Sequence, residues 1–303
     1  MIKTLYTLAV CTFIIMSVLT VFGQTGTLPG PEDKTKPDDK VIDGLSSIKF
    51  GINYLSNNVF MGRTDTVRTP VIMPELKYTF KSGIYFSGSL DYIPDKKKKK
   101  LDGGDFSAGY DLDITDDFSG GVSYTKLFYS SNSTQIASTI SSTINVNFTY
   151  DFCDIISPTV GADYNINKQG IGRDVIVNAE LTHDFNIKGV LGEEDILLIS
   201  PTATLNAGSQ NFYDAYLVKK KVNGTKKTAA QNALLIKYTN QLGQFQLLDY
   251  EISTPVEYKT GHFIFQFIPT YAIVKNQIPA AVSARISDQP SIFYYQLAVS
   301  LKF

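Results

Sequence analysis

The stretch that decides the fold is the end of the chain, Ser291 to Phe303, which reads SIFYYQLAVSLKF. Six apolar side chains fall on one parity: Phe293, Tyr295, Leu297, Val299, Leu301 and Phe303. The residues between them are mixed, and an alternation with a period of two is typical of a β-strand with one apolar face. The sequence therefore predicts a strand that closes the chain on an aromatic carboxyl terminus.

The opposite end of the chain has the pattern of an export leader. Lys3 precedes an apolar run from Leu5 to Phe22, and Gly23 and Gln24 begin a polar stretch. This order predicts a signal peptide over residues 1–23, cleaved after Gly23. An uncleaved transmembrane helix is the alternative, because the apolar run approaches the length of a membrane span.

Two further expectations follow from the leader and the stretch behind it. Cys11 would leave with the leader, so Cys153 would be the one remaining cysteine and no intramolecular disulfide could form. Gln24 to Lys40 is rich in proline and charge, which predicts a flexible periplasmic tail over residues 24–45. The tail is interpreted as a spacer, with a plug or a partner-binding arm as the alternative, and residues 46–303 are predicted to form one domain.

Apolar alternation continues through that domain and predicts about twelve strands. Their expected ranges are Ile48–Tyr54, Ile72–Phe80, Ile84–Tyr92, Phe106–Leu112, Phe118–Phe128, Ile144–Tyr150, Ile156–Tyr164, Val175–Leu181, Leu197–Leu205, Leu248–Tyr258, Phe263–Tyr271 and Ser291–Phe303. Short connections such as Lys81–Gly83 alternate with long ones such as the polar segment Gly208–Gln244. Prolines within strands cost ladder hydrogen bonds, so bulges or strand ends are expected at Pro74, Pro158, Pro201 and Pro269.

An aromatic terminal strand behind an export leader resembles the closing strand of Gram-negative outer-membrane β-barrel proteins. The resemblance implies an all-β fold, a single transmembrane antiparallel β-barrel of about 12 strands with both termini in the periplasm, located in the outer membrane. It implies as partners the barrel-assembly machinery, outer-membrane lipid and lipopolysaccharide, and an outer-membrane or periplasmic protein for the tail. The net charge of −1 gives no support for nucleic-acid binding.

Twelve strands predict a narrow lumen, with a backbone diameter of roughly 24 Å, about half of which side chains would fill. Charged residues on the mixed parity are the candidates for lining it: Lys49, Glu75, Lys77, Asp91, Asp111, Asp163, Glu180, Asp249, Glu251, Glu257 and Lys259. Acidic groups outnumber basic ones there, which predicts a channel for small polar solutes or ions with a weak preference for cations. The alternative is a structural or accessory barrel subunit of a larger outer-membrane complex, without transport activity.

Lysines gather in two of the long connections and are candidates for contact with anions or lipopolysaccharide phosphates. They are Lys96, Lys97, Lys98, Lys99 and Lys100 in one connection, and Lys219, Lys220, Lys221, Lys226 and Lys227 in the other. A solvated charged loop tip is the alternative interpretation. In a third long connection, Asp65, Thr66 and Val67 resemble the O-glycosylation pattern of exported Bacteroidota proteins.

Nothing in the sequence indicates catalysis. His183 and His262 both lie beside short connections, away from the outer leaflet where barrel phospholipases work, and no G-x-S-x-G motif occurs. Asp111, Asp113 and Asp116 begin like a calcium loop, but Asp116 stands where that motif needs glycine. We expect no enzyme activity, no cofactor and no metal.

Overall fold

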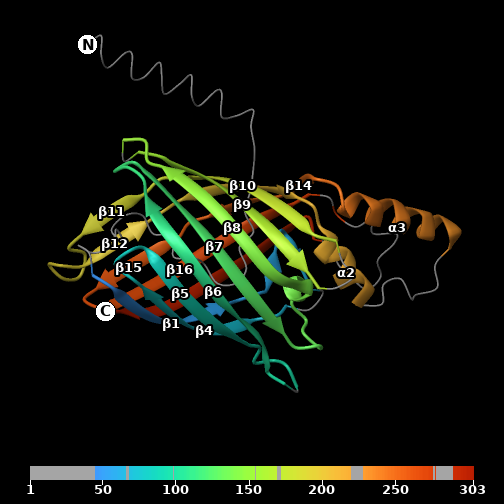
Figure 1. Cartoon of the computed structure of the whole chain (residues 1–303), viewed down its shortest axis with the longest axis horizontal. Coiled ribbons are helices and arrows are strands. Elements are labelled where there is room, and N and C mark those ends of the chain that lie inside the picture. Colours follow the sequence, from blue (N-terminus) through green and yellow to red (C-terminus); the bar gives the residue numbers. More distant parts are fainter. Residues whose placement is uncertain are drawn as a thin grey trace, which may run out of the picture.

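The computed structural model consists mainly of long antiparallel strands that close on themselves (Figure 1). It describes residues 45–65, 68–97, 99–153, 155–168, 172–219, 228–275, 277 and 289–303. The predicted signal peptide and nearly all of the predicted tail lie outside these residues. Both stay predictions.

The strands follow the alternating segments of the sequence closely. They are β1 Ser47–Leu55, β4 Val71–Thr79, β5 Ile84–Tyr92, β6 Leu101–Asp113, β7 Phe118–Tyr129, β8 Ile140–Tyr150, β9 Ser157–Asn167, β10 Asp174–Thr182, β11 Phe185–Lys188, β12 Ile196–Ile199, β13 Thr202–Gly208, β14 Gln246–Ser253, β15 Val256–Thr260, β16 Phe263–Val274 and β17 Ser291–Lys302. A separate short hairpin joins β2 Val59–Phe60 to β3 Arg63–Thr64.

The sheet closes because the last strand pairs with the first. β17 pairs with β16 on one side and with β1 on the other, where Lys302 lies opposite Lys49. The fifteen strand segments form twelve barrel strands. Three of these strands consist of two segments each, because the register is unchanged across the break: β10 with β11, β12 with β13, and β14 with β15. The prediction of an antiparallel barrel of about twelve strands is confirmed.

The three interrupted strands break side by side, and we call this line of breaks the crease. It runs through His183–Asp184, Ser200–Pro201 and Thr254–Pro255. Backbone bonds still cross it, from Ser200 N to Pro255 O at 2.9 Å and from Thr254 N to Pro269 O at 3.2 Å. Proline lacks the N–H group that donates to the neighbouring strand. The hydrogen-bond ladder is therefore interrupted where prolines of neighbouring strands lie side by side.

The expectation for the four strand prolines is met unevenly. Pro201 lies at a strand end, as predicted, and Pro269 lies within β16 where that strand faces the crease. Pro158, the second residue of β9, also lies at a strand end. Pro74 lies inside β4 and Pro269 inside β16 with no change of register, so the expectation of a bulge or strand end is wrong for these two. Pro74 pairs with Ile52 of β1, while its side toward β5 has a gap in the ladder.

The two faces of the barrel differ as the alternation predicts. Apolar side chains on the outer parity, such as Phe50, Leu76, Phe106 and Phe265, remain between 42% and 51% exposed in the isolated chain. A closed barrel with an apolar outer surface satisfies its backbone hydrogen bonds internally and presents only apolar groups to lipid. The protein is therefore an outer-membrane β-barrel, with the apolar parity facing lipid and the mixed parity facing inward.

The barrel has two unlike ends. At the terminal end, Ile48 N bonds to Phe303 O at 2.8 Å, and the neighbouring connections are short. At the loop end lie the β2–β3 hairpin, η3 (Ile136–Thr139), α2 (Asn211–Lys219) and α3 (Ala229–Leu242) (Figure 1). The segment 208–244, expected to be a polar loop, is therefore partly helical. No helix within the described residues is long and apolar enough to span a membrane.

Candidate functional site

The inner face of the barrel is the candidate functional site, and it carries all eleven charged residues selected from the sequence. Their positions follow from strand parity and pairing: Lys49, Glu75, Lys77, Asp91, Asp111, Asp163, Glu180, Asp249, Glu251, Glu257 and Lys259. Lys49, Glu75, Lys77, Glu180 and Glu251 stay partly exposed, so solvent reaches the interior. Asp91, Asp163, Asp249 and Glu257 are at most 2% exposed.

Several of these charges already have partners on the inner wall. Lys77 Nζ lies 3.9 Å from Asp111 Oδ2 and 4.2 Å above the ring of Tyr85. Lys259 Nζ lies 3.1 Å from Glu257 Oε1, near the terminal end. Lys77 and Lys259 are thus each held near a carboxylate, and the remaining carboxylates give the wall its acidic excess.

The loop end of the lumen is filled by an apolar cluster. Buried side chains of the loops pack together with inward residues of four strands: Phe60, Met61, Ile136, Ala137, Phe212, Tyr213, Tyr216, Leu217, Tyr238 and Leu242 from the loops, and Leu127, Ile140, Ile176 and Leu248 from the wall. Phe60 of the β2–β3 hairpin meets Phe212 of α2 edge to face, at 4.8 Å between ring centroids. We call this assembly, made by segments 56–65, 130–139 and 209–219 together with α3, the plug.

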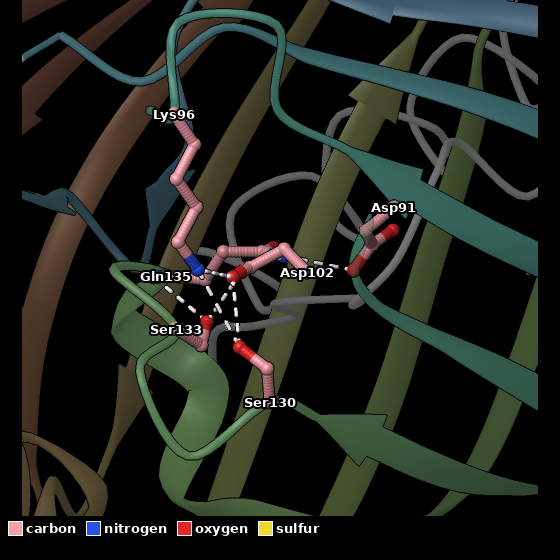
Figure 2. Close-up of polar contacts among 6 residues, drawn as sticks. All are labelled: Asp91, Lys96, Asp102, Ser130, Ser133 and Gln135. Carbon is pink, nitrogen blue, oxygen red and sulfur yellow. Dashed lines mark hydrogen bonds and ion pairs between the residues drawn. The ribbon is translucent and has the colours of Figure 1, made fainter. Parts of the chain in front are cut away.

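Buried carboxylates of the wall fix the plug, and Asp102 on β6 is the first of them (Figure 2). Its side chain is fully buried and accepts hydrogen bonds from Ser133 Oγ at 2.5 Å, Gln135 Nε2 at 3.1 Å and Ser130 Oγ at 3.2 Å. The Lys96 ammonium group also contacts Asp102 Oδ1. One carboxylate therefore ties the segment 130–139 to the barrel wall.

Asp174, the first residue of β10, holds the start of α2. Its carboxylate accepts backbone N–H bonds from Asn211 at 2.7 Å and Phe212 at 2.9 Å, and a hydroxyl bond from Ser209 at 2.7 Å. The first N–H groups of a helix have no partner within the helix, and a carboxylate placed there satisfies them. Asp174 is fully buried, so this contact fixes α2 inside the rim of the barrel.

Asp249 on β14 receives the tip of the β2–β3 hairpin. Arg63, only 1% exposed, interacts electrostatically with Asp249, donates to Gln210 Oε1 at 3.1 Å and lies 4.7 Å above the ring of Tyr213. The hairpin turns at Gly62, whose φ of +65° favours glycine. A Cβ there would lie 2.9 Å from Asp249 Oδ2, so the turn fits closely against the wall.

Together these three carboxylates anchor the plug across the mouth. β6 and β14 lie on opposite sides of the twelve-stranded barrel, and β10 lies between them. A body fixed to opposite walls and packed between them closes the opening. The plug therefore spans the loop end of the lumen, and the inner charges that remain partly exposed indicate that solvent reaches the interior.

The candidate anion-binding lysines divide into two groups. Lys97, Lys99 and Lys100 are exposed at the loop end, whereas the Lys96 ammonium group turns inward onto Asp102. The others, Lys98, Lys220, Lys221, Lys226 and Lys227, lie outside the described residues, as does the side chain of Lys219. Thr66 and Val67 of the glycosylation pattern also lie outside them.

The two histidines have no arrangement suited to hydrolysis. His183 Nδ1 contacts the Ile155 carbonyl oxygen, and His262 Nδ1 lies 2.9 Å from the Lys302 carbonyl oxygen. The hydrogen bonds of both rings thus go to the backbone, and the ring of His262 stacks on Phe303. In the part of the chain that the structure describes, no group of three or more His, Cys, Asp or Glu side chains could hold a metal ion.

Sequence reasoning selected Asp249 but missed the other two anchors. Asp102 and Asp174 stand at strand starts beside loops, where an aspartate is usually solvated. Their roles depend on Ser133 and on Asn211, which follow them by 31 and 37 residues. No local pattern marks such contacts.

Comparisons with known proteins add little to this picture. No family model and no curated protein matches the chain. Among solved structures, the KdgM porin is 10% identical over 85% of this chain and 99% of its own, with a TM-score of 0.45. The NanC porin is 10% identical over 85% and 100%, with 0.43, and LpxR from Salmonella typhimurium is 9% identical over 84% and 99%, with 0.39. Since these TM-scores lie below 0.5, the barrel assignment rests on the strand pairing.

Proposed function

We propose that the protein is a narrow outer-membrane channel for small polar solutes or ions, and that the plug closes it in the conformation described here. The observation that carries the proposal is the charged inner wall, on which several lysine and glutamate side chains remain partly exposed. A small barrel that serves only as an anchor can fill its interior with packed side chains. Here the interior keeps accessible lysine and glutamate side chains instead.

The orientation proposed for the channel places the loop end outside the cell. Outer-membrane barrels have short periplasmic turns and longer outer loops, so the termini would be periplasmic. Lys97, Lys99 and Lys100 would then face lipopolysaccharide phosphates, as single charges screened by salt over about 8 Å at physiological ionic strength. The plug would close the channel from the outside.

The solutes favoured by the wall are cationic. Eight of the eleven inner charged residues are carboxylates, and lysines pair with two of them, Asp111 and Glu257. In a narrow pore with low-dielectric walls, an excess of one sign raises the local concentration of the opposite sign. We infer a weak preference for cations, with the loop lysines opposing it at the mouth.

Opening the plug tests the proposal directly. Arg63→Ala removes the cation that faces the buried Asp249, and breaking one partner of such a pair costs about 3 kcal/mol. We expect the variant to conduct in planar bilayers at least tenfold more often than the wild type. Arg173→Ala is the matched control, because Arg173 is an exposed arginine at the same end.

The result that contradicts the proposal is equally clear. An Arg63→Ala barrel that is folded, as shown by its heat-dependent mobility in gels, yet stays silent would reject the channel. The accessory barrel would then be preferred. The observation in its favour is the extent of the plug cluster, whose apolar side chains are all buried.

A further inference from the structure

The contact between β5, β6 and the plug shown in Figure 2 has the composition of a binding site for a cationic group. We call Asp91, Lys96, Asp102, Ser133 and Gln135 the latch. Gln135 Nε2 lies between the two carboxylates, 2.9 Å from Asp91 Oδ2 and 3.1 Å from Asp102 Oδ2. A single amide nitrogen of the plug thus donates hydrogen bonds to two carboxylates of the wall.

The latch has more negative than positive charge. Its one cation, Lys96, contacts Asp102, and the charge that acts most strongly on Asp91 is that of Asp102, which is also negative. Asp91 is 2% exposed, and its Oδ1 has no hydrogen-bond partner within the described residues. Burying a carboxylate without a compensating cation is unfavourable, so the site would gain from a second positive group.

Further carboxylates lead from the latch down the inner wall. Asp105 and Glu75 flank Ser89 in one row across β6, β5 and β4, and the charges of Asp91 and Glu75 act on Asp105. A group with N–H donors and a positive charge bonds to carboxylates more strongly than a neutral amide does. An organic ammonium group fits this description, because its N–H donors match the two carboxylates that Gln135 Nε2 contacts.

We propose that the latch binds the ammonium group of a small organic amine, which takes the place of the Gln135 amide between Asp91 and Asp102. The proposal rests on the channel function and names its solute class. It also couples binding to opening, because Gln135 Oε1 accepts a bond from Asn58 Nδ2 at 3.1 Å. Displacing Gln135 therefore breaks one contact of segment 130–139 with the wall and one with segment 56–65 in a single step, which weakens the hold on the plug.

The experiment compares amine binding with conduction in the purified full-length barrel. Putrescine, a diamine, and 1,4-butanediol, its uncharged analogue, are titrated by calorimetry in detergent and added to planar bilayers. Asp91→Asn keeps the shape of the side chain and removes its charge, while Asp95→Asn does the same for an exposed carboxylate nearby. Losing one charge-assisted hydrogen bond predicts roughly tenfold weaker putrescine binding in Asp91→Asn.

The expected pattern is specific to the latch. Putrescine binds the wild type and Asp95→Asn alike and raises their open probability, whereas butanediol does neither. Equal putrescine binding in Asp91→Asn, or equal effects of the diol, would overturn the proposal. Gln135→Ala gives a second readout, because removing the competing amide should tighten putrescine binding.

The binding and conduction measurements distinguish a failure of the amine site from a failure of the channel function. If no variant conducts but putrescine binds and Asp91→Asn weakens it, the channel is rejected and the amine site stands. If Arg63→Ala conducts and putrescine binds Asp91→Asn as it binds the wild type, the channel stands and the amine site is rejected.

Discussion

At the scale of single residues, Asp195 shows how one carboxylate shapes a short turn. It accepts backbone N–H bonds from Val190, Leu191 and Gly192 at 2.7, 2.7 and 2.6 Å, and a hydroxyl bond from Tyr258 at 2.7 Å. Burial raises the pKa of Asp195, but these four hydrogen bonds favour the charged form and bring the pKa below its ordinary value of 3.8.

A pH dependence follows from the lowered pKa of Asp195. The carboxylate stabilises the turn fully above pH 3.8, and this contribution is lost as the pH falls through the lower pKa of the folded state. An NMR titration of the Leu191 and Gly192 amides in micelles should show a midpoint below 3.8. Asp195→Asn should remove the transition, and a midpoint above 3.8 would contradict the assignment.

At the scale of elements, α2 depends on a side chain that lies outside the helix. Asp174→Asn keeps the size of the capping group but weakens its bonds to Asn211 and Phe212. Loss of a helix cap costs about 1 kcal/mol, so the first amides of α2 should exchange with deuterium several-fold faster. Asp113→Asn, at an exposed position of β6, is the control, and unchanged exchange in Asp174→Asn would show that the cap is dispensable.

The elements also show what a sequence reveals about such a barrel. Strands such as β8 were predictable because a wall between lipid and lumen imposes strict alternation. The crease was not, because Leu248–Tyr258 alternates without interruption and the break at Pro255 arises where neighbouring prolines meet. The plug was hidden for another reason: Ile136 and Arg63 look like ordinary loop residues, and their burial depends on partners far away in the chain.

At the scale of the whole molecule, the acidic lumen should set ion selectivity. Glu251 accepts a bond from Tyr294 Oη at 3.2 Å, and Glu257 faces Lys259. Neutralising both carboxylates removes two negative charges from the wall, so selectivity should shift toward anions. In an Arg63→Ala background, Glu251→Gln with Glu257→Gln should move the reversal potential in a potassium chloride gradient toward the chloride value.

The control for the selectivity experiment lies outside the lumen. Asp116→Asn, in an exposed turn at the terminal end, should leave the reversal potential unchanged. The shift in the double variant should shrink at high salt, because screening lengths fall to about 3 Å at 1 M. If the reversal potential is the same with and without the Glu251→Gln and Glu257→Gln substitutions, the residues that set selectivity lie elsewhere in the lumen.

The crease has a mechanical consequence for the wall below the plug. β11, β12 and β15 remain paired with one another and with β16, but along the crease they are joined to the longer wall segments by few backbone bonds. Among the described residues β11 pairs with β12 alone, so its other side has no strand partner there. The amides of β11 are therefore expected to exchange with deuterium faster than those of strands that are paired on both sides.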